Sequence, residues 1–456
     1  MNLKQSRSQN KMLTLREKII YTVLILIGFR FLSHVPLPFV NPKYISSMIS
    51  NNGSLTFFNA LTGGGFEQMS LMALGITPYI SASIVVQLMG VVIPKLADMQ
   101  KDGATGQKQI KKINIGLSVV LAFVQSICMT WRFGSQGLLT SYTWYTVLIP
   151  AVLMTVGVFI LAYAGQMIEK HFFGNGISLI LLVGILASYF ADANTLYDAI
   201  KVDGSVQKTV IACAIAVIAV IALFWFAFFL NACEKDVHVT YSQKVSANGG
   251  ASSQHATIPL KLLSGSVVPI IFASSIITLP ALIEGFTGSD IKWLWIFNST
   301  KWFNKDCPWA TIGVLLYCVM IVGFSYYYNH LNLNELELAQ NLQRYGGYIN
   351  GVRPGKATAN YLKRQMKYMT FLGGLGLCVI AIVPTIATSL LNISRLSFLG
   401  TSIIITVSVV CESKAKFIAE YDAYGLYGKL SVGSAASRSL FSASTRKARH
   451  SLKGAK

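Results

Sequence analysis

Charged residues are scarce in this sequence. They make up 12% of the 456 residues, against about 25% in an ordinary soluble domain, while hydrophobic residues make up 53% and the mean hydropathy is +0.54. Acidic residues are the rarest of all, with 18 Asp and Glu against 38 Lys and Arg, so the formal net charge is +20. This composition excludes a soluble enzyme and a disordered chain, and it indicates a polytopic membrane protein with its cations gathered on one side.

Recognisable reaction chemistry is also missing. The seven cysteines are scattered, with no two closer than 11 positions, which excludes a CxxC zinc or redox pair and argues against a disulfide framework. No zinc-protease, serine-hydrolase or calcium-loop pattern occurs, and Gly351–Ala357 lacks the spacing and the hydroxyl of a phosphate loop. We therefore expect no enzyme, no metal and no cofactor.

Apolar runs of membrane-spanning character are present ten times, and each is expected to be helical because a span in lipid must satisfy its own backbone. The fifth and tenth runs are short, and Gly184 interrupts the fifth. The ten runs cover about 19–31, 71–93, 113–131, 144–164, 177–190, 210–230, 263–283, 310–327, 369–391 and 398–411.

The basic residues orient these spans. With both termini on one side of the membrane, the segments on that side contain 29 Lys and Arg and those on the opposite side contain 8. The positive-inside rule therefore places both termini in the cytosol.

The chain divides into two halves of five spans, which predicts an inverted repeat. An apolar patch followed by Gly63–Gly65 in the outer loop predicts a half-helix that dips back into the membrane. The last 26 residues contain seven Ser, six Lys or Arg and no acid, typical of a disordered basic tail. The expected division is a cytosolic N-terminus 1–18, an N-terminal half 19–191, an outer linker 192–209, a C-terminal half 210–411 with cytosolic loops 231–262 and 328–368, and a basic cytosolic tail 412–456.

Several motifs occur in a fixed order along these spans. They are Arg30-Phe-Leu-Ser-His-Val-Pro-Leu-Pro38, Phe57-Phe-Asn-Ala-Leu-Thr-Gly-Gly-Gly65, Ala73-Leu-Gly-Ile-Thr-Pro-Tyr-Ile-Ser-Ala-Ser-Ile84, Lys101-Asp-Gly-Ala-Thr-Gly106, Gly174-Asn-Gly-Ile-Ser178, Val268-Pro-Ile-Ile-Phe-Ala-Ser-Ser275 and Gly351-Val-Arg-Pro-Gly355. Together they make residues 15–415 resemble the SecY family, the channel subunits of the bacterial protein translocase.

The resemblance implies an all-α integral membrane fold, with two inverted five-helix halves around a central pore and a re-entrant plug helix. It implies a channel that passes unfolded secretory preproteins and releases signal peptides sideways into lipid, and that hydrolyses nothing. The implied partners are SecE-like and SecG-like membrane subunits, the SecA motor ATPase, the ribosome and anionic lipid, in a bacterial inner membrane.

The resemblance also implies site residues. We use four names for them. The pore ring is Ile76, Ile80, Leu181, Ile185, Ile271 and Ile405; the plug, at about 55–66, includes Leu55, Phe57, Phe58, Leu61, Gly63, Gly64 and Gly65; the lateral gate is Ser81, Ser83, Gln87, Ser274, Ser275 and Thr278; and the docking face is Arg353, Lys356, Lys363 and Arg364.

Physical chemistry supports these roles, although each set has an alternative. Aliphatic side chains four positions apart share a helix face and can close by excluding water, but such residues also face lipid. The plug glycines allow a hinge, or belong to a re-entrant helix that stays in place. Gate hydroxyls bond across the seam or to their own helix, and the docking cations bind an anionic partner or only add positive charge inside.

The sequence departs from the family's pattern at two places, and two further functional interpretations are open. Residues 234–244 have little net charge where the family has a basic cluster, and Asn350-Gly351 replaces the family's Pro-Gly. The altered loop and the basic tail are compatible with a specialised accessory channel that serves few substrates. A small-solute transporter with inverted repeats is disfavoured, because the spans contain almost no ionisable residues.

Overall fold

The computed structural model of the protein is helical apart from one small sheet. It describes residues 15–41, 45, 58–59, 61–171, 174–200, 206–241, 254–263, 268–287, 296–297, 302, 311–332, 335–390 and 399–421. The helices are α1 (Leu15–Leu32), α4 (Thr77–Val92), α5 (Pro94–Lys101), α6 (Gly103–Phe133), α7 (Trp144–His171), α8 (Gly176–Ile200), α9 (Val206–Ala232), α10 (Val268–Thr287), α11 (Ile312–Asn332), α12 (Glu335–Arg344), α13 (Lys356–Leu390) and the helical residues 399–421, with a π-helical turn η1 (Gly134–Leu138) after α6.

Each of the ten expected spans falls on a helix. Among the described residues, six helices are long and apolar enough to cross a membrane, and the pair α4 and α5, bent by 108°, makes a seventh. The other three expected spans lie in α1, in α10 and in residues 399–421, which are also helical. The chain is therefore an all-α, multi-pass membrane protein.

Helix bounds differ from the expected spans where the sequence contains glycine or polar residues. The fifth span is not short, because α8 has 25 residues and passes through Gly184 without a break. Much of the expected outer linker is helical, since α8 continues to Ile200 and α9 begins at Val206. The tenth helix continues to residue 421, and α13 begins at Lys356, well before the expected Met369.

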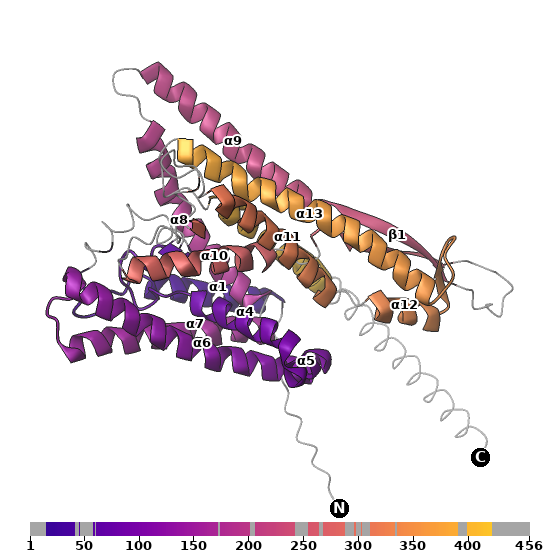
Figure 1. The fold of residues 1–456 in the computed structure, drawn as a ribbon, viewed down its shortest axis with the longest axis horizontal. Helices are drawn as coiled ribbons and strands as arrows, with labels where there is room; N and C mark the ends of the chain where they lie inside the picture. Colours follow the sequence, from indigo (N-terminus) through magenta and orange to yellow (C-terminus); the bar gives the residue numbers. More distant parts are fainter. Residues whose placement is uncertain are drawn as a thin grey trace, which may run out of the picture.

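The two halves of the chain form two groups of helices (Figure 1). In the N-terminal half, α6 and α7 lie side by side and α4 packs against α6. In the C-terminal half, α11 packs against both α10 and α13, and α9 contacts α13. α10 also contacts α6, so the two halves meet along this line.

The described parts of the two long loops, which the sequence predicts to be cytosolic, fold together into one unit. Strands β1 (Glu234–Tyr241), β2 (Gln254–Lys261) and β3 (Gly347–Ile349) form an antiparallel sheet in the order β2-β1-β3. The sheet projects at one end of the molecule beside α12 and the first turns of α13 (Figure 1). Its own small core is Val237, Val239, Leu260, Leu342, Ile349, Leu362 and Met366. This burial explains why α13 begins before the expected span.

Candidate functional site

Residues of the pore ring come from four different helices. Ile76 caps the start of α4 and Ile80 lies one turn into it, while Leu181 and Ile185 lie one turn apart on α8. Ile271 is on α10 and Ile405 is in the helical residues 399–421. Five of the six are buried, Ile271 is half-buried, and all belong to or pack against one hydrophobic cluster. The predicted ring residues therefore all belong to the same large apolar cluster, which includes many other residues of both halves.

A polar contact beside the ring was not anticipated from the sequence. The hydroxyls of Tyr189, on α8, and Thr406 lie 2.9 Å apart and form a hydrogen bond. These residues follow the ring positions Ile185 and Ile405 along their helices. The bond therefore joins the N-terminal half to the last helix one turn from the apolar ring.

The plug segment is seated against α8 through two glycines. A Cβ added to Gly63 would lie 2.9 Å from the Cα of Gly184, and a Cβ added to Gly184 would lie 2.9 Å from the carbonyl oxygen of Leu61. Both distances are shorter than real Cβ contacts, so only glycine fits on either side. Gly184, which the sequence suggested as an interruption of the fifth span, is the residue of α8 that contacts the plug segment at Leu61 and Gly63. We call this contact the plug seat.

Side chains of the plug are buried where the structure describes them. Phe58 and Leu61 are each 5% exposed, whereas Leu55 and Phe57 lie outside the described residues. Gly63 and Gly64 have φ of +67° and +84°, the left-handed region that glycine tolerates, and Gly65 does not. The hinge prediction therefore has a backbone basis at Gly63 and Gly64 alone.

Hydrogen bonds fasten the plug segment to itself and to α1. The Asn59 amide donates to the Glu67 carboxylate and the Glu67 backbone N–H donates to the Asn59 side-chain oxygen, each at 3.0 Å. The Thr62 hydroxyl accepts from the backbone N–H of Phe66. Nη1 of Arg30 donates to the carbonyl oxygen of Gly63. The sequence analysis used Arg30 only as the first residue of a family motif and did not predict this contact, which requires the folded position of the plug.

Gln87 on α4 links the two halves at the lateral gate. Its hydrogen-bond partners lie on α11 and not on α10, where the other predicted gate residues lie. The hydroxyl of Tyr327 donates to the Gln87 backbone carbonyl at 2.9 Å, and the hydroxyl of Tyr328 donates to Oε1 of Gln87. The Gln87 amide donates in turn to Ser83 at 3.0 Å. Neither tyrosine was predicted. A tyrosine hydroxyl that is buried needs a hydrogen-bond partner. The two tyrosines within an apolar span were therefore the signal in the sequence that could have indicated this contact.

The hydroxyls of Ser274 and Thr278 on α10 bond to their own helix, which is the second of the two interpretations of the sequence. Ser274 donates to the carbonyl of Ile270 at 2.8 Å, and Thr278 donates to that of Ser274 at 2.7 Å. A helical hydroxyl deprived of water satisfies itself on its own preceding turn. Ser275 is buried and Ser81 is half-buried. Gln87 is the predicted gate residue that reaches the opposite half.

The docking face occupies the turn before α13 and the first turns of that helix. Arg353, Lys356, Lys363 and Arg364 are all exposed, and the Arg364 guanidinium lies 5.9 Å from the centre of the Tyr368 ring. The Arg353 carbonyl accepts from the Thr358 hydroxyl at 2.9 Å. The sheet also fixes this turn, because Thr240 on β1 donates to the Asn350 side chain at 3.2 Å. Asn350 therefore ties the turn to the sheet, a contact that the family's proline could not make.

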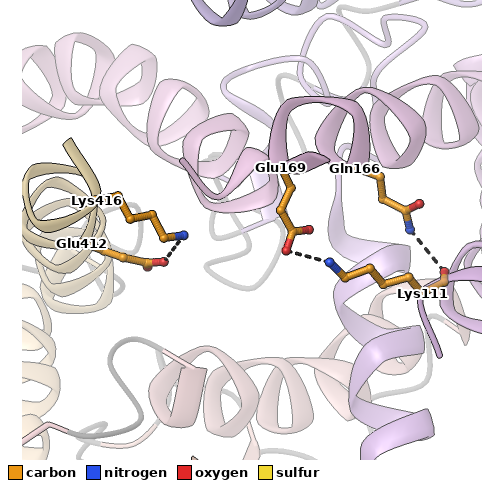
Figure 2. Close-up of polar contacts among 5 residues, drawn as sticks. All are labelled: Lys111, Gln166, Glu169, Glu412 and Lys416. Carbon is orange, nitrogen blue, oxygen red and sulfur yellow. Dashed lines mark hydrogen bonds and ion pairs between the residues drawn. The ribbon is translucent and has the colours of Figure 1, made fainter. Parts of the chain in front are cut away.

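Ion pairs lie at the expected cytosolic ends of the spans. Figure 2 shows the Lys111 ammonium against the Glu169 carboxylate, at 2.7 Å, and the Gln166 amide against the Lys111 carbonyl, at 3.2 Å. The pair Lys416–Glu412 is 2.9 Å apart on the last helix. Because these side chains are about one-third exposed to solvent, each pair contributes only about 0–1 kcal/mol. The Lys111–Glu169 pair joins α6 to α7, whereas the Lys416–Glu412 pair lies within the last helix.

Comparisons with known proteins agree with this arrangement. The protein translocase subunit SecY of Bacillus subtilis is 32% identical over 406 residues, which cover 88% of this chain and 93% of the relative. A solved SecY structure, whose plug domain stabilises the closed state of its translocation channel and maintains a membrane seal, aligns with a TM-score of 0.62 and 18% identity over 90% of this chain and 94% of that one.

A second solved structure shares the fold. Sec61 from the canine ribosome-channel complex of the endoplasmic reticulum aligns with a TM-score of 0.61 and 17% identity, over 90% of this chain and 94% of that one. At these identities the two structures show similarity of fold alone. The family model SecY matches residues 70–413, about three quarters of the sequence. The chain belongs to the SecY family.

Proposed function

We propose that this protein is the protein-conducting channel subunit of a Sec translocase. The observation that supports this most strongly is that six aliphatic side chains from four helices, the predicted pore ring, are buried or half-buried in the one apolar cluster that joins the two halves. Such a collar excludes water when closed, and it makes no directional bonds, so it yields around whatever side chain passes. The function itself is the one that the curated relatives' names state, and the chain covers almost their whole length.

The plug segment is proposed to close this channel a second time. Its seat on Gly184 lies next to the ring residue Ile185 on α8, so the two apolar barriers are adjacent in the fold. Arg30 and the Gly63–Gly184 contact hold the segment in its closed position. A polypeptide that enters the ring would have to displace these contacts.

The lateral gate is proposed to open by breaking the hydrogen bonds at Gln87. Bonds of this kind in membranes contribute on average about 0.6 kcal/mol and at most about 1.7. Two or three such bonds keep a seam closed at rest, yet a signal helix with a large apolar surface can separate it. The ring of Tyr328 also packs edge-on against the ring of Phe272 on α10, with ring centres 5.1 Å apart. Tyr328 therefore contacts both Gln87 on α4 and Phe272 on α10, the helices on the two sides of the seam.

Tyr328→Phe should therefore make the gate easier to open. The phenylalanine keeps the ring contact with Phe272 and loses only the hydroxyl that binds Gln87, so we expect insertion of a weakly apolar signal sequence to rise roughly two- to tenfold. The measurement is the translocated fraction of such a substrate in membrane vesicles. Tyr326→Phe is the matched control, since its hydroxyl donates to the Lys367 carbonyl within the same half at 3.1 Å. Equal effects of the two variants would contradict the assignment.

Both termini and the docking face are proposed to lie in the cytosol, in a bacterial inner membrane. The bias of basic residues supports this orientation. The exposed cations near Arg353 suit an anionic surface of a ribosome or a motor ATPase, and SecE-like and SecG-like subunits would complete the complex. The basic tail, residues 431–456, would add affinity for ribosomal RNA or anionic lipid.

Arg353→Glu should weaken binding of this cytosolic partner, and the loss should grow smaller as salt rises. We expect a decrease of roughly tenfold in affinity at low salt, corresponding to about 1.4 kcal/mol. Ribosome binding and motor ATPase binding to vesicles are measured separately. Lys170→Glu is the control, because it makes the same charge change on an exposed cytosolic residue at the end of α7. If both variants lose affinity equally, only net charge matters and the docking face is not specific.

Photocrosslinking tests the channel function directly. A photoreactive residue at Ile80 should form an adduct with a stalled secretory chain, and the adduct should depend on the length of that chain. The same residue at Val85, which is 41% exposed on α4, should contact lipid instead. Absence of an adduct at Ile80, or equal adducts at both positions, would refute a polypeptide path through the ring.

A further inference from the structure

Cys318 on α11 and Cys378 on α13 lie on two helices that pack against each other. Contacts join Cys318 to Cys378 and Asn329 to Thr370, so the helices run antiparallel. They approach closely at Gly374, where an added Cβ would lie 3.5 Å from the Cα of Val322. Cys318 lies one turn before Val322, and Cys378 lies one turn after Gly374. In an antiparallel pair this spacing places the two cysteines opposite each other.

The Cys378 thiol is in contact with Cys318. Sγ of Cys378 donates to the carbonyl oxygen of Cys318 at 3.7 Å. A disulfide needs Cα atoms about 4.4–6.8 Å apart. The close approach of the helix backbones one turn away and the contact of Sγ of Cys378 with the Cys318 backbone are the two observations from which we infer that such a bond can form.

The pair is accessible from the membrane side. Cys318 and Cys378 line an apolar groove of about 860 Å³ between α11 and α13, together with Val319, Val322 and Leu375. Cys318 is half-buried in this groove and Cys378 is buried behind it. An uncharged, lipid-soluble reagent can therefore reach Cys318 first, whereas a charged one is excluded by the apolar walls.

We propose that Cys318 and Cys378 form an oxidisable dithiol site whose co-reactant is a lipid-soluble hydroperoxide. The sulfur of Cys318 attacks the O–O bond, which breaks to release an alcohol and leaves a sulfenic acid on Cys318. The thiol of Cys378 then attacks that sulfur, an S–S bond forms and water leaves. In sum, two S–H bonds and one O–O bond break, and the hydroperoxide takes up two electrons and two protons.

The resulting disulfide ties together two helices of the C-terminal half. It fixes α11, the helix that contains Tyr327 and Tyr328, to α13. An adjacent second thiol also protects Cys318 from irreversible oxidation, because condensation to the disulfide removes the sulfenic acid. The dithiol site depends only on the contact between α11 and α13, so a failed test of this site would not contradict the proposed function, and the reverse also holds.

Cumene hydroperoxide, added to the full chain in lipid vesicles, tests the site. We expect the loss of two of the seven alkylatable thiols, a Cys318–Cys378 linked peptide in mass spectrometry, and full recovery with a reducing agent. Cys318→Ser and Cys378→Ser should each abolish the linked peptide. Cys128, which is exposed on α6, is the internal control for reagent access and should stay outside the disulfide.

A second variant measurement tests the order of the two steps. In Cys378→Ser the sulfenic acid at Cys318 has no resolving thiol, so dimedone should label Cys318, while Cys318→Ser should give no label at Cys378. Retention of all thiols in the wild type, or a disulfide that joins other cysteines, would overturn the proposal. Dimedone labelling of Cys378 alone would overturn the assignment of Cys318 as the attacking residue.

Discussion

Replacing Gly184 by alanine should open an ion leak through the resting channel. The added methyl group would lie 2.9 Å from the carbonyl oxygen of Leu61 and 3.5 Å from the backbone nitrogen of Gly63, so the plug segment must move away from α8. Overpacking of this kind costs about 1–3 kcal/mol. That free energy shifts the balance between seated and displaced plug by roughly 5- to 150-fold. The measurement is the conductance of the purified channel in a planar bilayer without substrate.

Gly28→Ala is the matched control for this experiment. Gly28 is also a helical glycine of the N-terminal half, but an added Cβ there has nothing within 4 Å. Alanine favours a helix over glycine by about 1 kcal/mol, so both variants gain the same local stability. A leak in Gly184→Ala alone assigns the effect to the plug seat. Equal conductance of the two variants and of the wild type would show that the contact does not hold a seal.

The opposite side of the same contact gives an independent comparison. Gly63→Ala meets the Gly184 backbone and is strained at φ of +67°, whereas Gly64→Ala is strained at φ of +84° but meets nothing within 4 Å. The left-handed conformation costs both alanines about 1–2 kcal/mol. Any additional leak in Gly63→Ala therefore reports the contacts of this position with α8 and with the Arg30 guanidinium, and not the backbone strain.

Much of the helical framework could be predicted from the sequence, because lipid permits only one way to satisfy the backbone. The small sheet and the early start of α13, which the sequence did not predict, have local causes. Val237, Val239 and Tyr241 alternate in a loop of low net charge, a strand signal that was missed while the loop was considered only for its charge. Lys356 to Met366 is polar enough to resemble a loop, but Leu362 and Met366 are buried against the sheet, which extends the helix.

For the candidate site, the sequence could indicate which residues share a face of one helix but not which residues of different helices make contact. Ile76 and Ile80 could be placed on one face because their spacing is a property of the helix. Gly184 could not be recognised as a seat, since a glycine in an apolar run also fits a break. The bond from Arg30 to Gly63 and the bond from Tyr328 to Gln87 join residues 33 and 241 positions apart. Only the tertiary fold brings such residues together.

Replacing Ile405 by asparagine should produce the second large leak, this time through the pore ring. Ile405 is 1% exposed, and burial of an amide without a partner costs about 2–7 kcal/mol, so water is expected to enter the ring and solvate it. Val410→Asn is the control on the same helix, where the side chain is 51% exposed. Conductance of the resting channel is measured as for Gly184→Ala. No leak in Ile405→Asn, or the same leak in the control, would remove Ile405 from the ring.

Combining Ile405→Asn with Gly184→Ala distinguishes one seal from two. If the ring and the plug close the pore in series and independently, a leak requires both to be open, and the fold-increases of the two single variants multiply in the double variant. If they form one cooperative barrier, either substitution opens it, and the second adds little. Independent sites are additive within about 0.3–0.5 kcal/mol, whereas coupled residues deviate by about 0.5–3 kcal/mol. The ring and the plug seat approach each other on α8, where Ile185 follows Gly184 directly, so a negative coupling in this cycle would trace to that turn of the helix. A product of the single effects would instead establish two separate seals, one of aliphatic side chains and one of backbone contacts.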